Sequence, residues 1–384
     1  MHYEYTHYVE SARVAGALYR QVYETLRDEI LAGEHPVGER LPSEEQLRQR
    51  FGVSVITIKR GLDLLRADGF IIRRPRVGTV VVSDVATSSP PQRAASLPLI
   101  GCVLTNFDDT FGTHVLGGVL DASNGAANVV VKRSLGNGEL EDEVIRGLVS
   151  VGVQALILQP SSSEYVPPSV LELVTSGFPV VILDRAFDGV PVSTVCSDNV
   201  SAAKRATEHL FSLGHDRVGL VTSSSHVSTI SDRHEGFVHA HAEFHVPHDP
   251  ANDFRSVRST IPGSTEPPAE DIERLAEYLA AHDQLTGLVA AEYSIAVLLR
   301  EACERLGRSV PNDVSIVCFD HPDPFPSFLF HFAHMRQDQQ GMGAAALGQA
   351  IAQVRDARAV KKISLATELV VGDSTATRPR PSAT

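Results

Sequence analysis

Short apolar runs alternate with helical stretches over most of this 384-residue chain, from about residue 99 onward. The apolar runs are LIGCVLT, NVVVKRS, VQALILQP, FPVVILD, STVCSDN, RVGLVTS, TGLVAAE and SIVCFD. This alternation of strand and helix predicts parallel sheets that helices cover on both faces. About 270 residues of the pattern are more than a single hydrophobic core usually holds, so we expect an α/β domain of two lobes.

A different pattern precedes these strands. The segment from Gly38 to Leu65, GERLPSEEQLRQRFGVSVITIKRGLDLL, packs two short amphipathic patterns around Gly52-Val53-Ser54. Before it, apolar residues recur every four positions and predict an amphipathic first helix. These residues are Leu18, Val22, Leu26 and Ile30.

Capping residues mark two further helices. Ser43, with Gln46 three residues later, matches a capping box and predicts the start of a second helix. Gly52 can take the left-handed conformation that ends this helix, and Ser54 can cap a third. The run GFIIRRPRVGTVVV that follows predicts a β-ribbon with a basic tip.

The charge of this segment differs from that of the chain. Nine Lys and Arg oppose five Asp and Glu from Pro36 to Val82, although the whole chain has a net charge of −13. A small positive module on an acidic body indicates a polyanionic partner at one end. Three helices with a basic ribbon predict a winged helix-turn-helix, an α+β domain whose third helix fits the major groove of DNA. A three-helix protein-interaction module is the alternative interpretation.

These motifs resemble the GntR family of bacterial transcription regulators over about Leu18 to Val82. The matching runs are GERLPSEEQL, FGVSVITIKRGLDLL, ADGFIIRR and VGTVV. The resemblance implies that residues of the helix-turn-helix and the wing contact DNA, namely Arg40, Ser43, Val55, Thr57, Lys59, Arg74, Arg76 and Gly78. Val55 stands where the family usually has a base-reading arginine. Two interpretations stay open for it: contact with a thymine methyl, or packing with Ile58 and Leu62.

The composition changes at SDVATSSPPQRAASLP, which runs from Ser83 to Pro98. Its Ser, Ala and Pro residues without periodicity predict a linker. We therefore expect a winged helix-turn-helix domain at 14–82, a linker at 83–98 and a two-lobed domain at 99–375.

The sequence shows few motifs that are typical of an enzyme, a metal site or a cofactor site. Neither GxGxxG nor GxxxxGK[ST] follows the first strand, and no GxSxG occurs. The four cysteines form no CxxC and predict free thiols. The His-rich stretch from His234 to His248 is interpreted as a solvated surface, with a nickel- or zinc-responsive site as the alternative. We expect no cofactor and no structural metal.

Ligands of open α/β sheets bind at the carboxyl ends of the strands. From about Leu99 to Thr375 the chain resembles the LacI/GalR effector-binding domain, which shares the fold of periplasmic sugar-binding proteins. The motifs that carry the resemblance include VQALILQPS, VCSDNVSAAKRATEHLFSLGHDRVGLV, SDRHEGF, RLGRSVPNDVSIVCFD and ELVVGDSTA. A GntR-type head on a LacI-type body resembles the arabinose-repressor subgroup.

The second resemblance implies an effector site in the cleft between the lobes. Its residues are Asn106, Phe107, Asp108, Phe111, Gln159, Ser161, Arg233, Phe254, Glu292 and Asp320. Arg233 matches an arginine that grips ligand oxygens, and Asp320 matches the acid that ends the family's GFD motif. Glu292 departs from the family pattern. With Asp320 it predicts an acidic pocket, suited to sugar hydroxyls or to a cationic ligand.

We therefore expect a transcriptional repressor whose affinity for double-stranded operator DNA changes when a small-molecule effector, most simply a sugar, binds in the cleft. A homodimer is expected, because paired heads reach successive major grooves. The absence of a bilayer-spanning run and of a secretory signal predicts the cytoplasm and no membrane partner. The alternative is a cytoplasmic α/β sugar-binding protein or an enzyme without DNA-linked regulation.

Overall fold

The structure, a computed structural model, describes residues 18–74, 78–84, 97–107, 110–322 and 330–378. It divides into two units, Met1–Ser96 and Leu97–Thr384. Two of the predicted site residues, Arg76 and Asp108, lie outside the described residues, and so does the side chain of Arg74. Within the described residues, no helix combines the length and the apolar character needed to cross a lipid bilayer.

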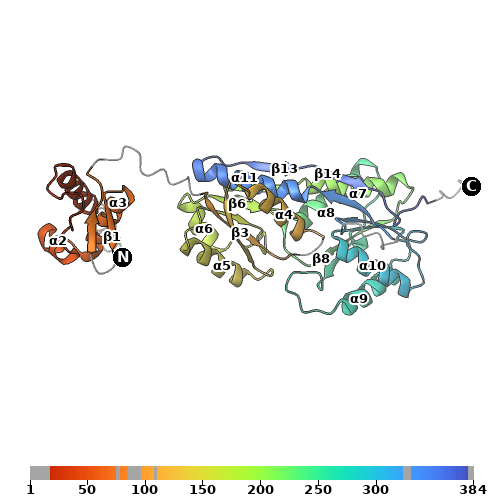
Figure 1. Cartoon of the computed structure of the whole chain (residues 1–384). Helices are drawn as coiled ribbons and strands as arrows, with labels where there is room; N and C mark the ends of the chain where they lie inside the picture. Colours follow the sequence, from red (N-terminus) through yellow and green to blue (C-terminus); the bar gives the residue numbers. More distant parts are fainter. Residues whose placement is uncertain (1–17, 75–77, 85–96, 108–109, 323–329, 379–384) are drawn as a thin grey trace, which may run out of the picture. The chain divides into compact units, whose positions relative to one another are not determined.

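The first unit is a three-helix domain with a β-hairpin (Figure 1). A helix over 18–31 is followed by α2 (Glu44–Phe51), α3 (Val55–Ala67), β1 (Ile71–Arg74) and β2 (Gly78–Val81). The two strands pair antiparallel. The core contains the predicted apolar faces, with Val22, Leu26, Ile30, Leu47, Ile58, Leu62 and Leu65 among its residues. The predicted helix-turn-helix with a hairpin is confirmed.

Local capping rules place the ends of α2 and α3. The Ser43 hydroxyl accepts a hydrogen bond from the Gln46 N–H at 3.3 Å, and the Gln46 side chain accepts one from the Ser43 N–H at 2.8 Å. Gly52 ends α2 with φ 65°. The Ser54 hydroxyl accepts from the Thr57 N–H at 3.2 Å and starts α3. The predicted caps are thus present.

The second unit consists of two lobes, each built on a six-stranded sheet. The sheet of lobe 1 is parallel throughout, in the order β13-β7-β6-β5-β3-β4. Its strands are β3 (Leu99–Leu104), β4 (Asn128–Arg133), β5 (Ala155–Leu158), β6 (Val180–Leu183), β7 (Ser193–Ser197) and β13 (Lys362–Leu365). β5 and β6 read ALIL and VVIL and are buried along their whole length, as central strands covered on both faces must be.

The sheet of lobe 2 has the order β14-β12-β11-β10-β8-β9. Its strands are β8 (Val218–Ser223), β9 (Phe254–Val257), β10 (Gly287–Ala290), β11 (Ser315–Phe319), β12 (Ala333–Gln337) and β14 (Thr367–Val370). The prediction of parallel sheets is confirmed except at one edge, where β14 runs antiparallel to β12. A single residue, Ala366, joins β13 to β14. The chain therefore passes directly from β13 into β14, without the helical crossover that parallel strands require, and β14 runs opposite to its neighbour.

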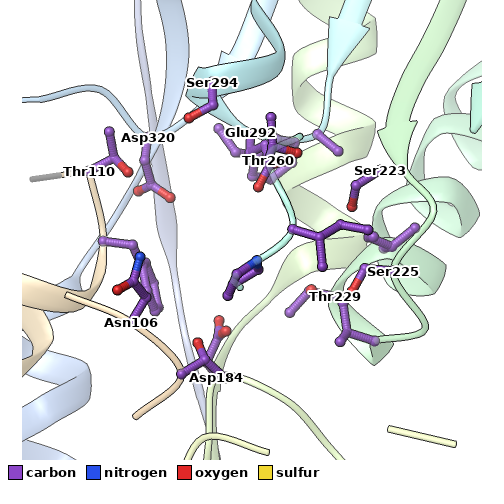
Figure 2. Close-up of a pocket in the computed structure, with 18 of the residues that line it drawn as sticks. Asn106, Thr110, Asp184, Ser223, Ser225, Thr229, Thr260, Glu292, Ser294 and Asp320 are labelled. Carbon is purple, nitrogen blue, oxygen red and sulfur yellow. The ribbon is translucent and has the colours of Figure 1, made fainter. Parts of the chain in front are cut away.

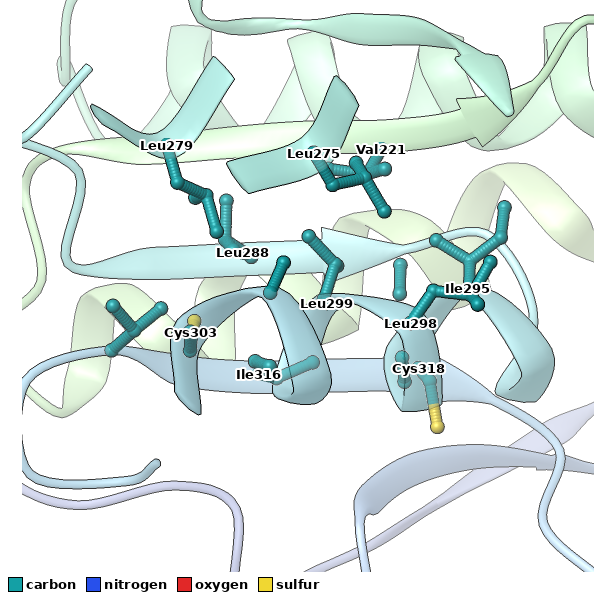
Figure 3. Close-up of a cluster of buried hydrophobic side chains, with 14 of the residues drawn as sticks. Val221, Leu275, Leu279, Leu288, Ile295, Leu298, Leu299, Cys303, Ile316 and Cys318 are labelled. Carbon is teal, nitrogen blue, oxygen red and sulfur yellow. The ribbon is translucent and has the colours of Figure 1, made fainter. Parts of the chain in front are cut away.

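Helices cover both faces of each sheet. In lobe 1, α4 (Gly112–Ser123) and α11 (Gln339–Arg355) pack on one face, and α5 (Gly138–Ser150) and α6 (Pro168–Thr175) pack on the other. In lobe 2, α7 (Asn199–Ser212) and α8 (Ser228–Glu243) lie opposite α9 (Pro268–Ala281) and α10 (Tyr293–Arg305). Figure 3 shows Leu299 of α10 packed beside Leu288 of β10 and Ile316 of β11.

Three connections between the lobes lie in the described residues. The chain crosses from β7 to α7 at Asp198, from β12 to α11 at Asp338 and from β13 to β14 at Ala366. Both aspartates cap the helix that they precede, with acceptor distances of 3.0 Å to the Ser201 N–H and 2.9 Å to the Gly341 N–H. Each of these two crossings is therefore tied to the first turn of a helix.

Candidate functional site

A cavity of about 370 Å³ lies between the lobes, at the carboxyl ends of their strands. Figure 2 shows Asn106 and Asp184 of lobe 1 facing Ser223 and Thr229 of lobe 2 across it. Hydroxyl groups predominate among its polar side chains. They belong to Thr105, Thr110, Ser223, Ser225, Thr229, Ser259, Thr260, Ser264, Tyr293 and Ser294.

Charged groups of both signs also line the cavity. Within the described residues these are the carboxylates of Asp184, Glu292 and Asp320 and the guanidinium groups of Arg185 and Arg233. Carboxylates accept hydrogen bonds and guanidinium groups donate them, whereas hydroxyl groups do both. Such a lining suits a small ligand that carries several hydroxyl groups.

Arg233, on α8, is held rigidly in the wall of the cavity. Its side chain is buried, its Nε donates to Asn199 Oδ1 at 2.9 Å, and its Nη1 donates to the carbonyl of Ala291. The guanidinium carbon lies 3.8 Å from the centroid of the Phe319 ring. Burial lowers the pKa of Arg233, while the nearby carboxylates, first Asp320, act against this effect. The guanidinium plane is thus fixed before any ligand arrives.

Asp320 follows β11 directly and has φ 60°, a conformation that turns its carboxylate toward the hinge. Its Oδ2 accepts a hydrogen bond from Gln337 at 2.6 Å, and its Oδ1 accepts one from Gln339 at 2.8 Å. Burial raises the pKa of Asp320 to about 6, against the opposing effects of Arg233 and the two glutamine amides. The two glutamines flank the crossing at Asp338, so Asp320 is bonded to the hinge itself.

Gln159 joins the loops that follow three strands of lobe 1. Its Nε2 donates to Asp184 Oδ2 at 2.9 Å, and its Oε1 accepts from the N–H and the hydroxyl of Thr105 at 3.1 and 3.0 Å. Arg185 is buried beside them, donates to the carbonyl of Pro160 and has its Nε 3.8 Å from Asp184 Oδ2. This side of the cavity is therefore also preorganised.

The cavity brings together six of the predicted effector residues: Asn106, Phe111, Gln159, Arg233, Glu292 and Asp320. Three other predicted residues that the structure describes do not line it. Ser161 donates its hydroxyl and its N–H to the buried Glu141 at 2.6 and 2.7 Å. Phe254 packs on Tyr278, with ring centroids 5.2 Å apart. Phe107 packs against the apolar core beneath α4 and α11.

Several lining residues were missed by the sequence analysis. Asp184, Ser223 and Thr105 each stand at the carboxyl end of a predicted strand, and this position was the signal that pointed to them. Residues 259–264 offered no such signal, because they follow β9 (Phe254–Val257), which was not among the predicted strands. They reach the cavity only through the fold of lobe 2.

The His-rich stretch is packed rather than fully solvated. His241 is buried and, like His248, contacts the ring of Phe237, with centroids 4.6 and 5.4 Å away. The interpretation as a solvated surface is therefore wrong for His241, since aromatic packing withdraws it from water. Among the residues that the structure describes, no group of three His, Cys, Asp or Glu is placed to hold a metal ion.

In the first unit, the amino end of α3 presents a mixed surface. Val55 is 38% exposed, so it does not join Ile58 and Leu62 in the core. Of its two interpretations, the core position is therefore excluded. Thr57 is half-buried, and its Oγ1 lies 2.9 Å from Ser54 Oγ, within the cap of the helix.

Basic side chains surround this surface. Lys59 Nζ and Arg73 Nη2 lie 4.0 and 3.2 Å from the two carboxylate oxygens of Glu44, which joins α3 and β1 to α2. Arg40 lies beside the hairpin, where it forms an isolated β-bridge with Val80 of β2. Gly78 lies against this guanidinium, since a Cβ there would be 2.6 Å from Arg40 Nε, and its φ of 105° favours glycine. Ser43 is exposed, and its hydroxyl caps α2.

An exposed third helix with a basic hairpin, on the same chain as two lobes around a polar cavity, defines the class of transcriptional regulators with an effector domain. Family comparisons give the same assignment. Residues 18–81 match the bacterial regulatory proteins of the gntR family, and residues 101–263 match the periplasmic binding proteins and sugar binding domain of the LacI family. Residues 207–375 match a periplasmic binding protein-like domain. The chain thus combines a GntR-type helix-turn-helix domain with LacI-type, periplasmic-binding-protein-like domains.

Individual relatives agree with this assignment. The arabinose metabolism transcriptional repressor of Geobacillus stearothermophilus is 25% identical over 366 residues, which cover 93% of this chain and 97% of that protein. The protein of the same name from Halalkalibacterium halodurans is 24% identical and covers 79% of this chain and 80% of its own length. A LacI family regulator from Enterococcus faecium with bound ribose shares the fold, with a TM-score of 0.62 at 21% identity over 73% of this chain and all of that one.

Proposed function

We propose that this protein is a dimeric repressor that releases operator DNA when a neutral sugar binds between the lobes of its effector domain, residues 99–375. The observation that carries the proposal is the polar cavity in which Arg233 and Asp320 meet hydroxyl-bearing residues of both lobes. L-arabinose is the first sugar to test, because two relatives, one of which covers 93% of this chain, are named for arabinose metabolism.

The charges of the cavity favour a neutral ligand. The carboxylates of Asp184, Glu292 and Asp320 would repel a phosphate group, whereas Arg185 and Arg233 already donate to protein carbonyls. A sugar hydroxyl can donate to a carboxylate and accept from a guanidinium group at the same time. The same chemistry favours a sugar over a sugar phosphate.

The hinge can couple ligand binding to DNA binding. Asp320 is hydrogen-bonded to Gln337 and Gln339, on either side of the crossing between the lobes. A ligand that binds Asp320 and lobe 1 together favours one lobe arrangement, and the paired heads respond through the linker. A coupling free energy of about 1–3 kcal/mol would change DNA affinity roughly 5- to 150-fold.

We propose that the head, residues 14–82, contacts DNA through its third helix and its hairpin. The proposed contacts are Arg40, Ser43, Val55, Thr57, Lys59, Arg74, Arg76 and Gly78. Support comes from the exposure of Arg40, Ser43, Val55 and Lys59 and from the basic charge of the segment. Two heads in a homodimer require a near-palindromic operator, and the protein would act where the chromosome lies, in the cytoplasm.

The test is a gel-shift assay with the full chain and the DNA upstream of its own gene, with and without L-arabinose. We expect a shifted band that L-arabinose weakens, while sedimentation at the same concentrations gives the mass of a dimer. Absence of any shift would contradict the repressor. Turnover of the sugar in the same samples would instead support an enzyme on this scaffold.

A further inference from the structure

The loop between β9 and α9 forms one wall of the cavity. Residues 259–264 of this loop, here called the lid, all line the cavity, and every one of them belongs to lobe 2. The position of the lid therefore affects the size of the ligand that the cavity can hold.

The lid is fixed to the start of α9. The buried carboxylate of Asp271 accepts hydrogen bonds from the N–H groups of Arg258 and Ser259 at 3.0 and 2.7 Å. Arg274 bonds both Asp271 and Glu266, so it ties the two ends of the loop together. The lid consequently moves with lobe 2 as one rigid turn.

The tip of the lid closes against lobe 1. A Cβ at Gly263, where φ is 79°, would lie 2.4 Å from the carbonyl oxygen of Leu135. From the other side, a Cβ at Gly136, where φ is 69°, would lie 2.7 Å from the carbonyl oxygen of Pro262. Two glycines thus allow backbone to meet backbone across the cleft, and a side chain at either position would force the lid away.

Elsewhere on the rim the lobes are joined by hydrogen bonds. The N–H of Ser163, in lobe 1, donates to the carbonyl of His226 at 2.8 Å, and the N–H of Ser228 donates to the hydroxyl of Ser163 at 2.9 Å. Within the described residues, the lid therefore adds to other contacts that close the cavity. At about 370 Å³, the space left is near the lower end of the range for small-molecule sites.

We propose that the lid limits the length of the effector, so that the cavity admits one sugar ring and rejects a disaccharide. This inference rests on the proposed sugar-binding function. A second ring would have to pass between the lid and the turn at Leu135 and Gly136, and this would separate the two backbones and open the lobes.

The test compares two substitutions that break the lid contact with two matched controls in the full chain. Gly263→Ala and Gly136→Ala break the contact from its two sides. Gly307→Ala in lobe 2 and Gly177→Ala in lobe 1 impose the same backbone strain, with φ 67° and 75°, but a Cβ there meets nothing within 4 Å. Circular dichroism checks that each variant folds.

Calorimetry with L-arabinose and maltose gives the first readout. We expect the wild type and both controls to bind L-arabinose at least about 30-fold more tightly than maltose, and the two lid variants to reduce this ratio to within about threefold. Equal binding of both sugars by the wild type would overturn the proposal. So would a ratio that is the same in the lid variants and their controls.

A second readout needs no sugar and separates the lid from the proposed function. Spin labels at Leu171→Cys in α6 and Val297→Cys in α10, both exposed, report the distance between the lobes. We expect the distance distribution to shift or broaden in the lid variants and to stay unchanged in the controls. If neither sugar binds, the proposed sugar-binding function is wrong. Unchanged distances in the lid variants would separately contradict the proposed role of the lid.

Discussion

The guanidinium group of Arg233 lies against the ring of Phe319, with its central carbon 3.8 Å from the ring centroid. Phe319 is the residue directly before Asp320. This contact couples an arginine of α8 to the end of β11, which Asp320 follows directly. A planar group can stack on the ring while its edge still donates hydrogen bonds, which an ammonium group cannot do. The identity of this residue, and not only its charge, should therefore matter.

Arg233→Lys should weaken effector binding. Lysine cannot stack on Phe319 and also bond Asn199 and the carbonyl of Ala291. We expect L-arabinose affinity to fall about 10- to 100-fold in calorimetry, with DNA affinity in the absence of sugar unchanged. The matched control is Arg300→Lys on α10, whose guanidinium lies 4.1 Å from the Phe330 ring and outside the cavity. Equal losses in both variants would argue against a ligand role for Arg233.

Asp320 should make the stability of the effector domain depend on pH. Burial raises its folded-state pKa from 3.8 to about 6, so between about pH 4 and pH 6 the folded state holds a proton that the unfolded state has lost. Stability from this group is then fully present below about pH 4 and is lost as the pH rises through 6. The loss is at most about 3 kcal/mol. Denaturant unfolding at pH 5 and pH 7.5 should show a smaller decrease in Asp320→Asn.

Effector affinity should change in the opposite direction with pH. If a sugar hydroxyl donates to Asp320, the ionised carboxylate binds it better, and affinity should rise between pH 5 and pH 7.5 with a midpoint near 6. Calorimetry in buffers of different ionisation enthalpy should detect proton release at pH 5.5. Asp320→Asn should bind more weakly and with a flat profile, and a wild-type profile that is equally flat would refute this role.

Ser43→Ala should destabilise the head alone. The substitution removes the hydroxyl that accepts the Gln46 N–H at the start of α2. An N-cap of this kind is worth about 1 kcal/mol, which corresponds to a melting shift of roughly 4–8 °C for a domain of this size. Differential scanning calorimetry of the full chain should show the transition of the head moving and that of the effector domain staying in place, so that the molecule supplies its own control.

Lys59→Ala and Val55→Ala should affect DNA binding in different ways. If Lys59 contacts a phosphate, its loss should lower the slope of log affinity against log salt by about 1 for every sequence tested. Arg66→Ala, at the other end of α3 and paired with Asp63 at 3.0 Å, is the control.

Val55→Ala should leave the slope unchanged and reduce discrimination at one base pair, as fluorescence anisotropy on substituted operators would show. A changed slope in Val55→Ala would point to altered docking instead.

Features with local causes could be predicted from the sequence. The capping box of Ser43 and Gln46, the left-handed Gly52 and the buried runs of β5 and β6 each follow from residues a few positions apart. The resemblance to known families predicted Arg233 and Asp320 as site residues, because both stand within motifs that match the family pattern. Phe254 and Ser161 were predicted in the same way, and the cavity does not include them.

The sequence by itself determined most strands of the two sheets, where α2 and α3 begin, and that an electropositive head precedes an α/β body, because these properties depend on neighbours along the chain. Only the tertiary structure decided which side chains share the cavity. Phe254 packs on the ring of Tyr278. Ser161 donates to Glu141, because a buried carboxylate needs hydrogen-bond donors. The meeting of Gly263 with Leu135 across the lobes has no trace in local sequence, because it depends on how two sheets are held about a hinge.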